Sequence, residues 1–300
     1  MLRICPSVPI TWRGRGCLQF GVEDPVLIDG LLPAEASLIE DLRMGLASAQ
    51  FHHRAQELGI DLARATSLIS LLAEADVLIP SDSDTSAMAK GSKALSTARL
   101  FRRTPDETSE VLAARTVAVL GPLRSPVAHQ LSLAGFAVST ASRVDESEAL
   151  AHPIVVTTSH LVPDLHSATW LVDREIDHCQ VVAGEFTVTL TGLVRPGRTP
   201  CTICGCLSLR DADADWFDQY PRIRALQDRD ELSDPLAAGV AATHIALVLR
   251  RALLEDAAEP MVRSVDLRTG FADEEELAFH PRCHCRAPVP CFGRPEEAAQ

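Results

Sequence analysis

Two pairs of cysteines constrain the fold of this 300-residue chain more than any other feature. Cys201 and Cys204 are separated by two residues, a spacing that lets one tight turn direct both sulfur atoms at a single ion. Cys283 and Cys285 form a second pair about eighty residues later. Four soft ligands from two such turns suit a tetrahedral structural zinc ion with a closed coordination shell. The pattern predicts that the loop carrying the first pair is tied to the C-terminal part of the chain.

Buried free thiols or a redox pair are the alternatives for these cysteines. A redox motif requires neither a second pair nor the long separation, so zinc is the better interpretation. Cys206, His284 and Cys291 are further candidate ligands, which leaves the fourth position open. A closed site contributes to folding rather than to catalysis.

Composition excludes several classes of protein. With 46% hydrophobic residues the chain is globular, and its net charge of −13 argues against nucleic acid as the main partner. The longest apolar run, Ala237–Leu249, contains His244 and ends at Arg250, so no membrane span is expected. Residues 1–21 hold prolines and arginines where a signal peptide needs an unbroken apolar core. A cytoplasmic location is therefore expected.

Residues 1–80 have the pattern of a small domain. Short apolar or alternating segments between turn residues predict a meander of three strands, and leucines at helical spacing then predict three helices. Leu38, Leu42 and Leu46 share one face of the first helix. The predicted strands are Ile10–Trp12, Leu18–Phe20 and Val26–Ile28. The first predicted helix begins at Pro33, the second covers Gln50–Leu58, and the third follows an N-cap at Asp61. Three strands and three helices predict a winged-helix-like module.

A polar stretch follows, and we interpret residues 81–112 as a linker. From residue 113 to residue 300 the pattern is α/β, beginning with a buried strand at Thr116–Leu120. Further strands alternate with helices, which predicts a parallel sheet. A polar loop is expected after Cys204, with Asp211, Asp213 and Asp215 as solvated carboxylates and with Trp216, Phe217 and Tyr220 anchoring it to the core.

The turn after the first α/β strand is where a phosphate-binding loop would lie. It reads Gly121-Pro-Leu-Arg-Ser-Pro126 and keeps one of the three glycines of the dinucleotide-binding motif. The sequence also lacks a Walker A motif, a nucleophile elbow and a metalloprotease helix. These features favour a nucleotide-binding fold that has lost its nucleotide, without catalytic residues and without ATP.

Three segments carry a resemblance to a known family: Val8–Gly14, Pro196–Cys204 and His280–Cys285. Their sequence and order resemble actinobacterial ThiF-like proteins of thiazole/oxazole-modified microcin (TOMM) biosynthesis, which are described as leader-peptide-binding proteins or cyclodehydratase accessory proteins. Asp211, Asp213 and Trp216 also match this pattern, whereas Cys206 and Ser208 replace an acidic residue and a histidine.

The resemblance implies a PqqD-like module, a RiPP recognition element, followed by a degenerate ThiF/ubiquitin-activating-enzyme-like α/β domain with a structural zinc site. It further implies a division of labour in bacteriocin biosynthesis. The module binds the leader of a ribosomal precursor peptide, and a separate YcaO-type cyclodehydratase uses ATP to form azolines. This chain would then deliver substrate without catalysing the reaction, and a homodimer is a further expectation.

A three-stranded sheet with an open edge offers unpaired backbone groups to which an extended leader can add as a strand. Apolar side chains of the leader would then lie against the third helix. The predicted peptide contacts are Leu18, Gln19, Phe20, Val26, Ile28, Leu68 and Leu72. Plain core packing is the alternative for each of them.

Two other functions stay open at this point. An active ThiF-type adenylating enzyme needs an ATP loop and its charged partners, which we cannot place in the sequence. A zinc-containing winged-helix DNA-binding regulator needs a basic surface, whereas residues 1–80 carry six arginines, no lysine and ten acidic residues.

Overall fold

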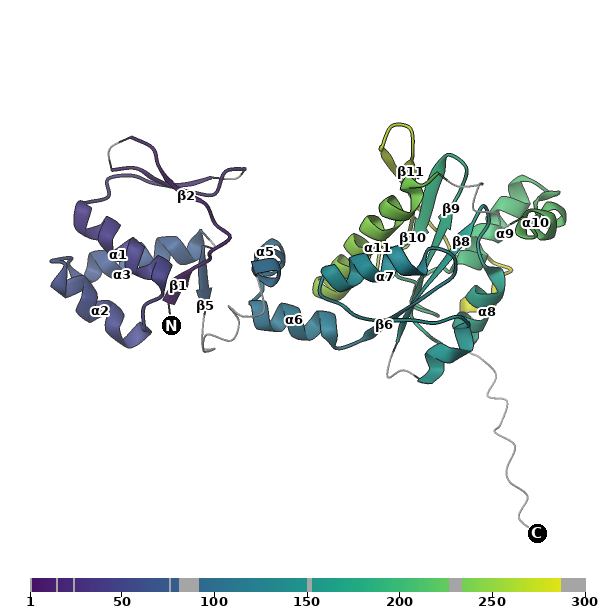
Figure 1. Cartoon of the computed structure of the whole chain (residues 1–300), viewed down its shortest axis with the longest axis horizontal. Helices are drawn as coiled ribbons and strands as arrows, with labels where there is room; N and C mark the ends of the chain where they lie inside the picture. Colours follow the sequence, from purple (N-terminus) through teal and green to yellow (C-terminus); the bar gives the residue numbers. More distant parts are fainter. Residues whose placement is uncertain are drawn as a thin grey trace, which may run out of the picture. The chain divides into compact units, whose positions relative to one another are not determined.

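The computed structural model describes residues 2–14, 16–23, 25–75, 77–80, 92–149, 153–226 and 234–286. The chain divides into two compact units, Met1–Glu110 and Val111–Gln300, and each is described by itself (Figure 1).

The N-terminal unit contains the predicted meander, residue for residue. Strands β2 (Ile10–Trp12), β3 (Leu18–Phe20) and β4 (Val26–Ile28) form an antiparallel sheet in the order β2-β3-β4. The middle strand of a meander is necessarily central, and Gln19 of β3 is paired with Thr11 on one side and Leu27 on the other. Among the described residues, β3 therefore has no open edge, and the edges belong to β2 and β4.

Three helices follow, as predicted: α1 (Pro33–Met44), α2 (Ser48–Glu57) and α3 (Leu62–Glu74). Asp61 caps α3 by accepting hydrogen bonds from the backbone N–H groups of Ala63 and Arg64. Leu46 differs from the prediction. Helix α1 ends before Gly45, whose φ of 99° stops it, and Leu46 instead forms a β-bridge with Leu2.

A second, two-stranded sheet in this unit was not predicted. Strand β1 (Leu2–Ile4) pairs antiparallel with β5 (Leu78–Pro80). The two strands are three residues long and more than seventy residues apart, so neither has a local pairing signal. Together the sheets and helices bury one core, which includes Phe20, Leu38 and Leu72.

The segment interpreted as a linker is partly helical. Residues 81–91 lie outside the described residues, but α5 (Ser92–Leu100) and α6 (Pro105–Ala113) follow. A capping box begins α6: the Glu107 carboxylate accepts from the Thr104 N–H at 3.0 Å, and the Glu107 N–H donates to Thr104 Oγ1 at 3.2 Å.

The second unit is built on a seven-stranded mixed sheet in the order β12-β11-β10-β9-β8-β6-β7. The predicted parallel pairing is confirmed for strands β7, β6, β8 and β9. It does not extend to β10, β11 and β12, each of which pairs antiparallel with its neighbours. A tight connection makes β9 and β10 a hairpin, which excludes a crossover there. The strands are β6 (Thr116–Leu120), β7 (Ala137–Thr140), β8 (Ile154–His160), β9 (His178–Ala183), β10 (Thr187–Thr191), β11 (Met261–Asp266) and β12 (Ala272–Glu276).

Helices cover both faces of this sheet (Figure 1). One face holds α7 (Arg124–Leu133) and α11 (Leu236–Leu254), and the other holds α8 (Leu165–Asp173). Two more helices, α9 (Thr202–Ala212) and α10 (Trp216–Arg224), occupy the region predicted as a polar loop. Short 3₁₀ helices, η1 and η3, cover Val144–Ala149 and His284–Arg286.

Helix α11 is, within the described ranges, the one helix whose length and apolar composition would suffice to cross a membrane. In the fold it packs against α7 and against strands β9 and β10. Its buried face includes Ala241, Ile245 and Leu249 at helical spacing, as expected for a core helix of an α/β unit.

Candidate functional site

The four predicted cysteines converge on one point. The sulfur atoms of Cys201, Cys204, Cys283 and Cys285 all lie within 4.8 Å of one another. Sγ of Cys201 is 3.6 Å from Sγ of Cys283, and Sγ of Cys204 is 3.5 Å from Sγ of Cys285. A tetrahedron with metal–sulfur distances of about 2.3 Å has edges of about 3.8 Å. The donor set and its spacing therefore fit a four-coordinate metal ion.

Local backbone structure positions these sulfur atoms. Cys201 is the N-cap residue of α9, and the Cys204 N–H donates to the Cys201 carbonyl at 2.9 Å, so one turn presents both thiols. Cys285 lies in η3, and its carbonyl accepts from the Gly197 N–H at 3.0 Å. The loop before α9 and the second cysteine pair are thus in direct contact.

A histidine and a carboxylate connect the segment before Cys283 to helix α9. His280 is buried, and its Nε2 lies 3.0 Å from Oδ2 of Asp211 on α9. Asp211 also forms an ion pair with Arg282. The Asp211 side chain is half exposed, as predicted for a solvated carboxylate, but it lies on a helix rather than on a loop and connects α9 to the segment that carries Cys283.

The additional candidate ligands are not members of the cluster where the structure describes them. Cys206 is buried elsewhere on α9, and burial raises the pKa of its thiol to about 12. His284 points its Nε2 at Asp173, 3.1 Å away. Cys291 lies outside the described residues.

The turn after β6 approaches the neighbouring strand closely. Gly121 has a φ of +89°, and a Cβ atom there would lie 1.9 Å from the carbonyl oxygen of Thr158 on β8. Only glycine fits, for steric as well as conformational reasons. The glycine retained from the dinucleotide-binding pattern therefore serves strand packing in this structure.

Two of the backbone N–H groups of this turn, those of Leu123 and Arg124, are already committed. Thr158 Oγ1 donates to the Leu120 carbonyl at 2.7 Å and accepts from the Leu123 N–H at 3.0 Å. The Arg124 N–H donates to the Gly121 carbonyl, and the prolines at positions 122 and 126 have no N–H. Phosphate-binding loops need several free N–H groups directed at the ligand. The Thr158 hydroxyl occupies one of the positions that such a ligand would use.

A polar cavity of about 380 Å³ lies beside this turn, at the carboxyl ends of β6 and β8. Strand order reverses between these strands, which is where open α/β sheets bind ligands. The carboxylates of the cavity are Asp145 and Asp164, and they are paired with Arg143 at 2.8 Å and Arg224 at 3.1 Å. Neither is an uncompensated carboxylate of the kind that holds Mg²⁺.

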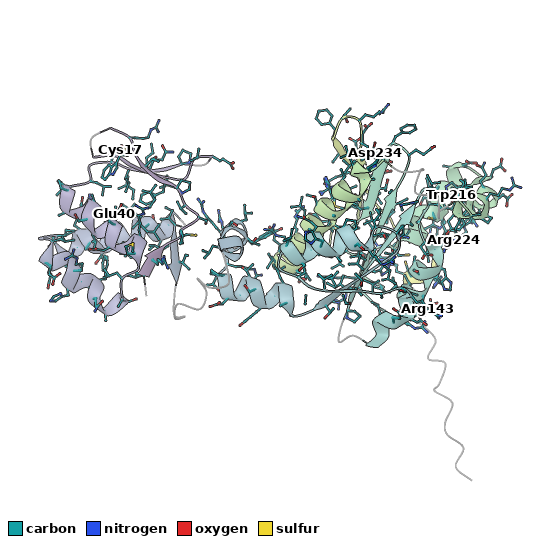
Figure 2. All side chains as sticks on the ribbon, viewed as in Figure 1. Cys17, Glu40, Arg143, Trp216, Arg224 and Asp234 are labelled. Carbon is teal, nitrogen blue, oxygen red and sulfur yellow. The ribbon has the colours of Figure 1, made fainter. Side chains whose placement is uncertain are left out.

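Helix α10 closes one side of this region. Its aromatic residues pack together, with the ring centroids of Trp216 and Tyr220 5.6 Å apart, and Trp216 and Arg224 mark its two ends in Figure 2. The Tyr220 hydroxyl donates to the Pro163 carbonyl at 2.8 Å. The predicted anchoring role is thus confirmed for Tyr220, on a helix rather than on a loop.

The predicted peptide contacts lie mostly inside the N-terminal core. Leu18, Phe20, Ile28, Leu68 and Leu72 are buried, whereas Gln19 and Val26 are half-buried. Two neighbouring leucines that the sequence reasoning missed are the exposed ones, Leu27 on β4 and Leu71 on α3, each 44% exposed. Strand alternation is the signal that separates Leu27 from its buried neighbour Ile28.

The backbone of β4 offers its free groups at Leu27. The Gly21 N–H bonds the Pro9 carbonyl and the Arg13 N–H bonds the Cys17 carbonyl, so Gln19 between them directs its backbone groups at β2. Leu18 and Phe20 consequently bond to β4 through Ile28 and Val26. The N–H and C=O of Leu27 therefore point to the open edge of the sheet.

No protein-family model and no curated protein matches the chain. Solved structures do: the heterocyclase TruD matches 94% of this chain with a TM-score of 0.68 at 15% identity, and the match covers 42% of TruD. E. coli MccB with MccA matches 95% of this chain and 99% of MccB, with a TM-score of 0.64 at 11% identity. MccB has also been solved with ATP, and that structure matches with a TM-score of 0.63 at 12% identity. The chain thus has the fold of these biosynthetic enzymes, and it spans less than half the length of TruD.

Proposed function

We propose that this chain recognises the leader of a ribosomal precursor peptide and delivers the peptide to a YcaO-type, ATP-dependent cyclodehydratase that forms azolines or azoles. The observation that carries the proposal is the likeness to TruD, because 94% of this chain adopts a fold that occupies 42% of a heterocyclase. In this proposal the covalent step belongs to the cyclodehydratase.

The edge of β4 is the proposed leader site. Leu27 presents both of its backbone groups there, and an extended peptide needs such groups to add as a strand. Leu27 and Leu71 supply exposed apolar surface, while Leu18, Phe20 and Leu72 support the strand and helix from within the core. The proposed site therefore stays on the predicted strand and helix. Its direct contacts are Leu27 in place of Val26 and Ile28, and Leu71 in place of Leu72.

The geometry of the turn after β6 supports a role without catalysis. Thr158 and Gly121 accept hydrogen bonds from the Leu123 and Arg124 N–H groups of the turn, and the two carboxylates of the adjacent cavity are paired with arginines. An adenylating enzyme must hold triphosphate and Mg²⁺ in this place. We therefore assign no ATP to this chain, and we assign structural zinc to the four cysteines because four thiolates at tetrahedral spacing suit zinc.

An active ThiF-type adenylating enzyme is the second candidate, because MccB, which has this fold, was solved with ATP. ATP–pyrophosphate exchange separates the two functions. We expect no exchange with any precursor peptide, and robust exchange would overturn the delivery role. The third candidate is a DNA-binding regulator, which the net negative charge of residues 1–80 disfavours. If the chain had this function, DNA would show a gel shift with it at low salt.

A binding titration tests the leader site on the whole protein. The probe is a fluorescein-labelled leader peptide from the short Cys/Ser/Thr-rich reading frame that we expect beside a YcaO-type gene. Leu27→Pro removes the outward N–H of β4 without touching the hydrogen bonds to β3, and edge strands tolerate proline. We expect a loss of affinity of roughly tenfold or more, equivalent to one peptide hydrogen-bond pair.

Leu27→Ala is the matched variant, because it shortens the side chain and keeps the N–H. It should bind substantially better than Leu27→Pro if the leader adds as a strand. Leu71→Arg should weaken binding, whereas Leu247→Arg, at an exposed leucine on α11, should not. Equal affinities for all four variants would exclude the β4 edge. With the cyclodehydratase and ATP added, mass spectrometry should detect loss of water from the peptide, and this chain with ATP alone should give none.

A further inference from the structure

A second cavity, of about 170 Å³, lies within the N-terminal unit between β5 and the helices α5 and α6. Its lining includes the apolar residues Leu78, Ile79 and Leu95. It also includes three arginines, Arg99, Arg102 and Arg103. The cavity has the size of one or two amino-acid side chains and is too small for a nucleotide.

The arginines belong to a cationic segment of an otherwise acidic protein. Residues 90–103 contain five lysines and arginines and no carboxylate, while the whole chain has a net charge of −13. Arg43, Arg54 and Arg64 in the same unit form ion pairs. Arg99 and Arg102 form no ion pair with any residue that the structure describes.

The one carboxylate of the cavity forms no ion pair with these two arginines. Glu107 accepts a hydrogen bond from the Thr104 N–H at 3.0 Å as part of the capping box of α6. This bond lowers the pKa of Glu107, and the carboxylate remains tied to the backbone.

The backbone at Arg102 indicates that its side chain matters. The Arg103 N–H bonds the Ala98 carbonyl and the Arg102 N–H bonds the Arg99 carbonyl, which is the Schellman arrangement at the end of α5. Arg102 occupies the left-handed position of this motif, with a φ of 50°. Glycine is the residue that fits this position without strain. An arginine there is explained by a use for its charge at the cavity.

We infer that this cavity binds a carboxylate of an acidic peptide segment, held by Arg99 and Arg102, with a neighbouring aliphatic side chain seated against Leu78, Ile79 and Leu95. Guanidinium groups bind carboxylates through paired hydrogen bonds, and the apolar lining residues offer a surface for the neighbouring aliphatic side chain. The inference rests on the proposed function, since the acidic segment belongs to the leader peptide. It adds an acidic–aliphatic residue pair to what the leader must contain.

The experiment uses the full chain and two probes. N-acetyl-Glu-Leu-amide is titrated while the arginine Nε–H signals are followed by NMR, with N-acetyl-Gln-Leu-amide and inorganic phosphate as matched probes. Saturable shifts of Arg99 and Arg102 with the Glu peptide alone are the expected result. The labelled leader is titrated in parallel against Arg99→Gln and Arg102→Gly, and each should lose about tenfold in affinity, as for one charge-assisted contact.

Arg102→Gly is the informative variant because glycine suits the left-handed backbone and keeps the turn intact. Arg222→Gln, at an exposed arginine of the second unit, makes the same change in charge and should bind like the wild type. Wild-type leader affinity in Arg102→Gly and Arg99→Gln would overturn the cavity and leave the proposed function standing. Binding of the dipeptide without binding of any leader would support the cavity as a carboxylate site and overturn the proposed recognition of a leader. Saturation by phosphate without the Glu peptide would overturn the assignment of a peptide carboxylate.

Discussion

Arg64 on α3 donates a hydrogen bond from Nε to Oε1 of Glu35 on α1 over 2.6 Å. The Glu35 side chain is 1% exposed, and its other oxygen accepts from the Leu32 N–H at 2.8 Å. A buried carboxylate therefore joins the first helix of the N-terminal unit to the third. The helix that flanks the proposed leader site depends on this contact for its position.

Replacing Glu35 by glutamine should destabilise the protein near neutral pH. The hydrogen bond from Arg64 lowers the pKa of Glu35, so its contribution is present above the unfolded value of about 4.3 and is lost as the pH falls through the lower folded value. Glu35→Gln keeps an acceptor for Leu32 and removes the charge, at a cost of roughly 1–3 kcal/mol. Urea denaturation near pH 7 and near pH 3 checks this, and the difference should shrink at the lower pH. Glu40→Gln, at an exposed carboxylate of α1, should change little.

The cysteine cluster predicts a metal content of about one zinc ion per chain. Cys204→Ser should lose the ion and lower the melting temperature, because the clasp between α9 and η3 opens. Elemental analysis of native protein gives the first readout and a thermal melt the second. Cys206→Ser should retain the ion, and a loss of zinc in that variant would place Cys206 in the coordination shell.

Gly121→Ala should destabilise the second unit with no nucleotide present. A Cβ atom at this position would meet the Thr158 carbonyl at 1.9 Å and would also impose a left-handed alanine, so the loss should exceed the roughly 1–3 kcal/mol of backbone strain alone. Gly270→Ala isolates the strain, because Gly270 has a φ of +74° and open space around it. Equal losses in both variants, measured by chemical denaturation, would contradict the close approach of β6 and β8.

His178 should make the second unit sensitive to mild acid. Burial lowers the pKa of His178 to about 4, so only the unfolded chain takes up a proton as the pH falls below the ordinary value of about 6.5. Stability should decline between these values by up to about 3 kcal/mol and level off below them. His178→Gln should flatten the profile over this window. His166→Gln, at an exposed histidine, should leave the slope unchanged.

Local sequence signals predicted the elements that depend on near neighbours. Turn residues fix the bounds of β2, β3 and β4, and Asp61 caps α3 through its side chain. The β1–β5 pair could not be predicted, since Leu2 and Pro80 are far apart in the sequence and their pairing depends on the tertiary fold. Helix α6 had an available signal, the Thr104–Glu107 capping box, which lies in the segment interpreted as a linker.

The four-cysteine cluster was predictable because the spacing of two cysteines in the sequence indicates whether one turn can direct both thiols at the same point. The peptide surface was less so. Apolar residues such as Leu18 and Leu72 satisfy a binding pattern and a core pattern equally, and only burial separates the two. The cavity beside α5 could not be predicted from the sequence either, because only the tertiary fold brings its arginines to the same cavity as Leu78 and Ile79.

The bonds of the Thr158 hydroxyl have a consequence for the cell. A turn that supplies its own acceptor needs no metabolite to become ordered, so the second unit should reach its native state whether ATP is abundant or exhausted. Folding of the second unit would then be independent of the concentration of ATP.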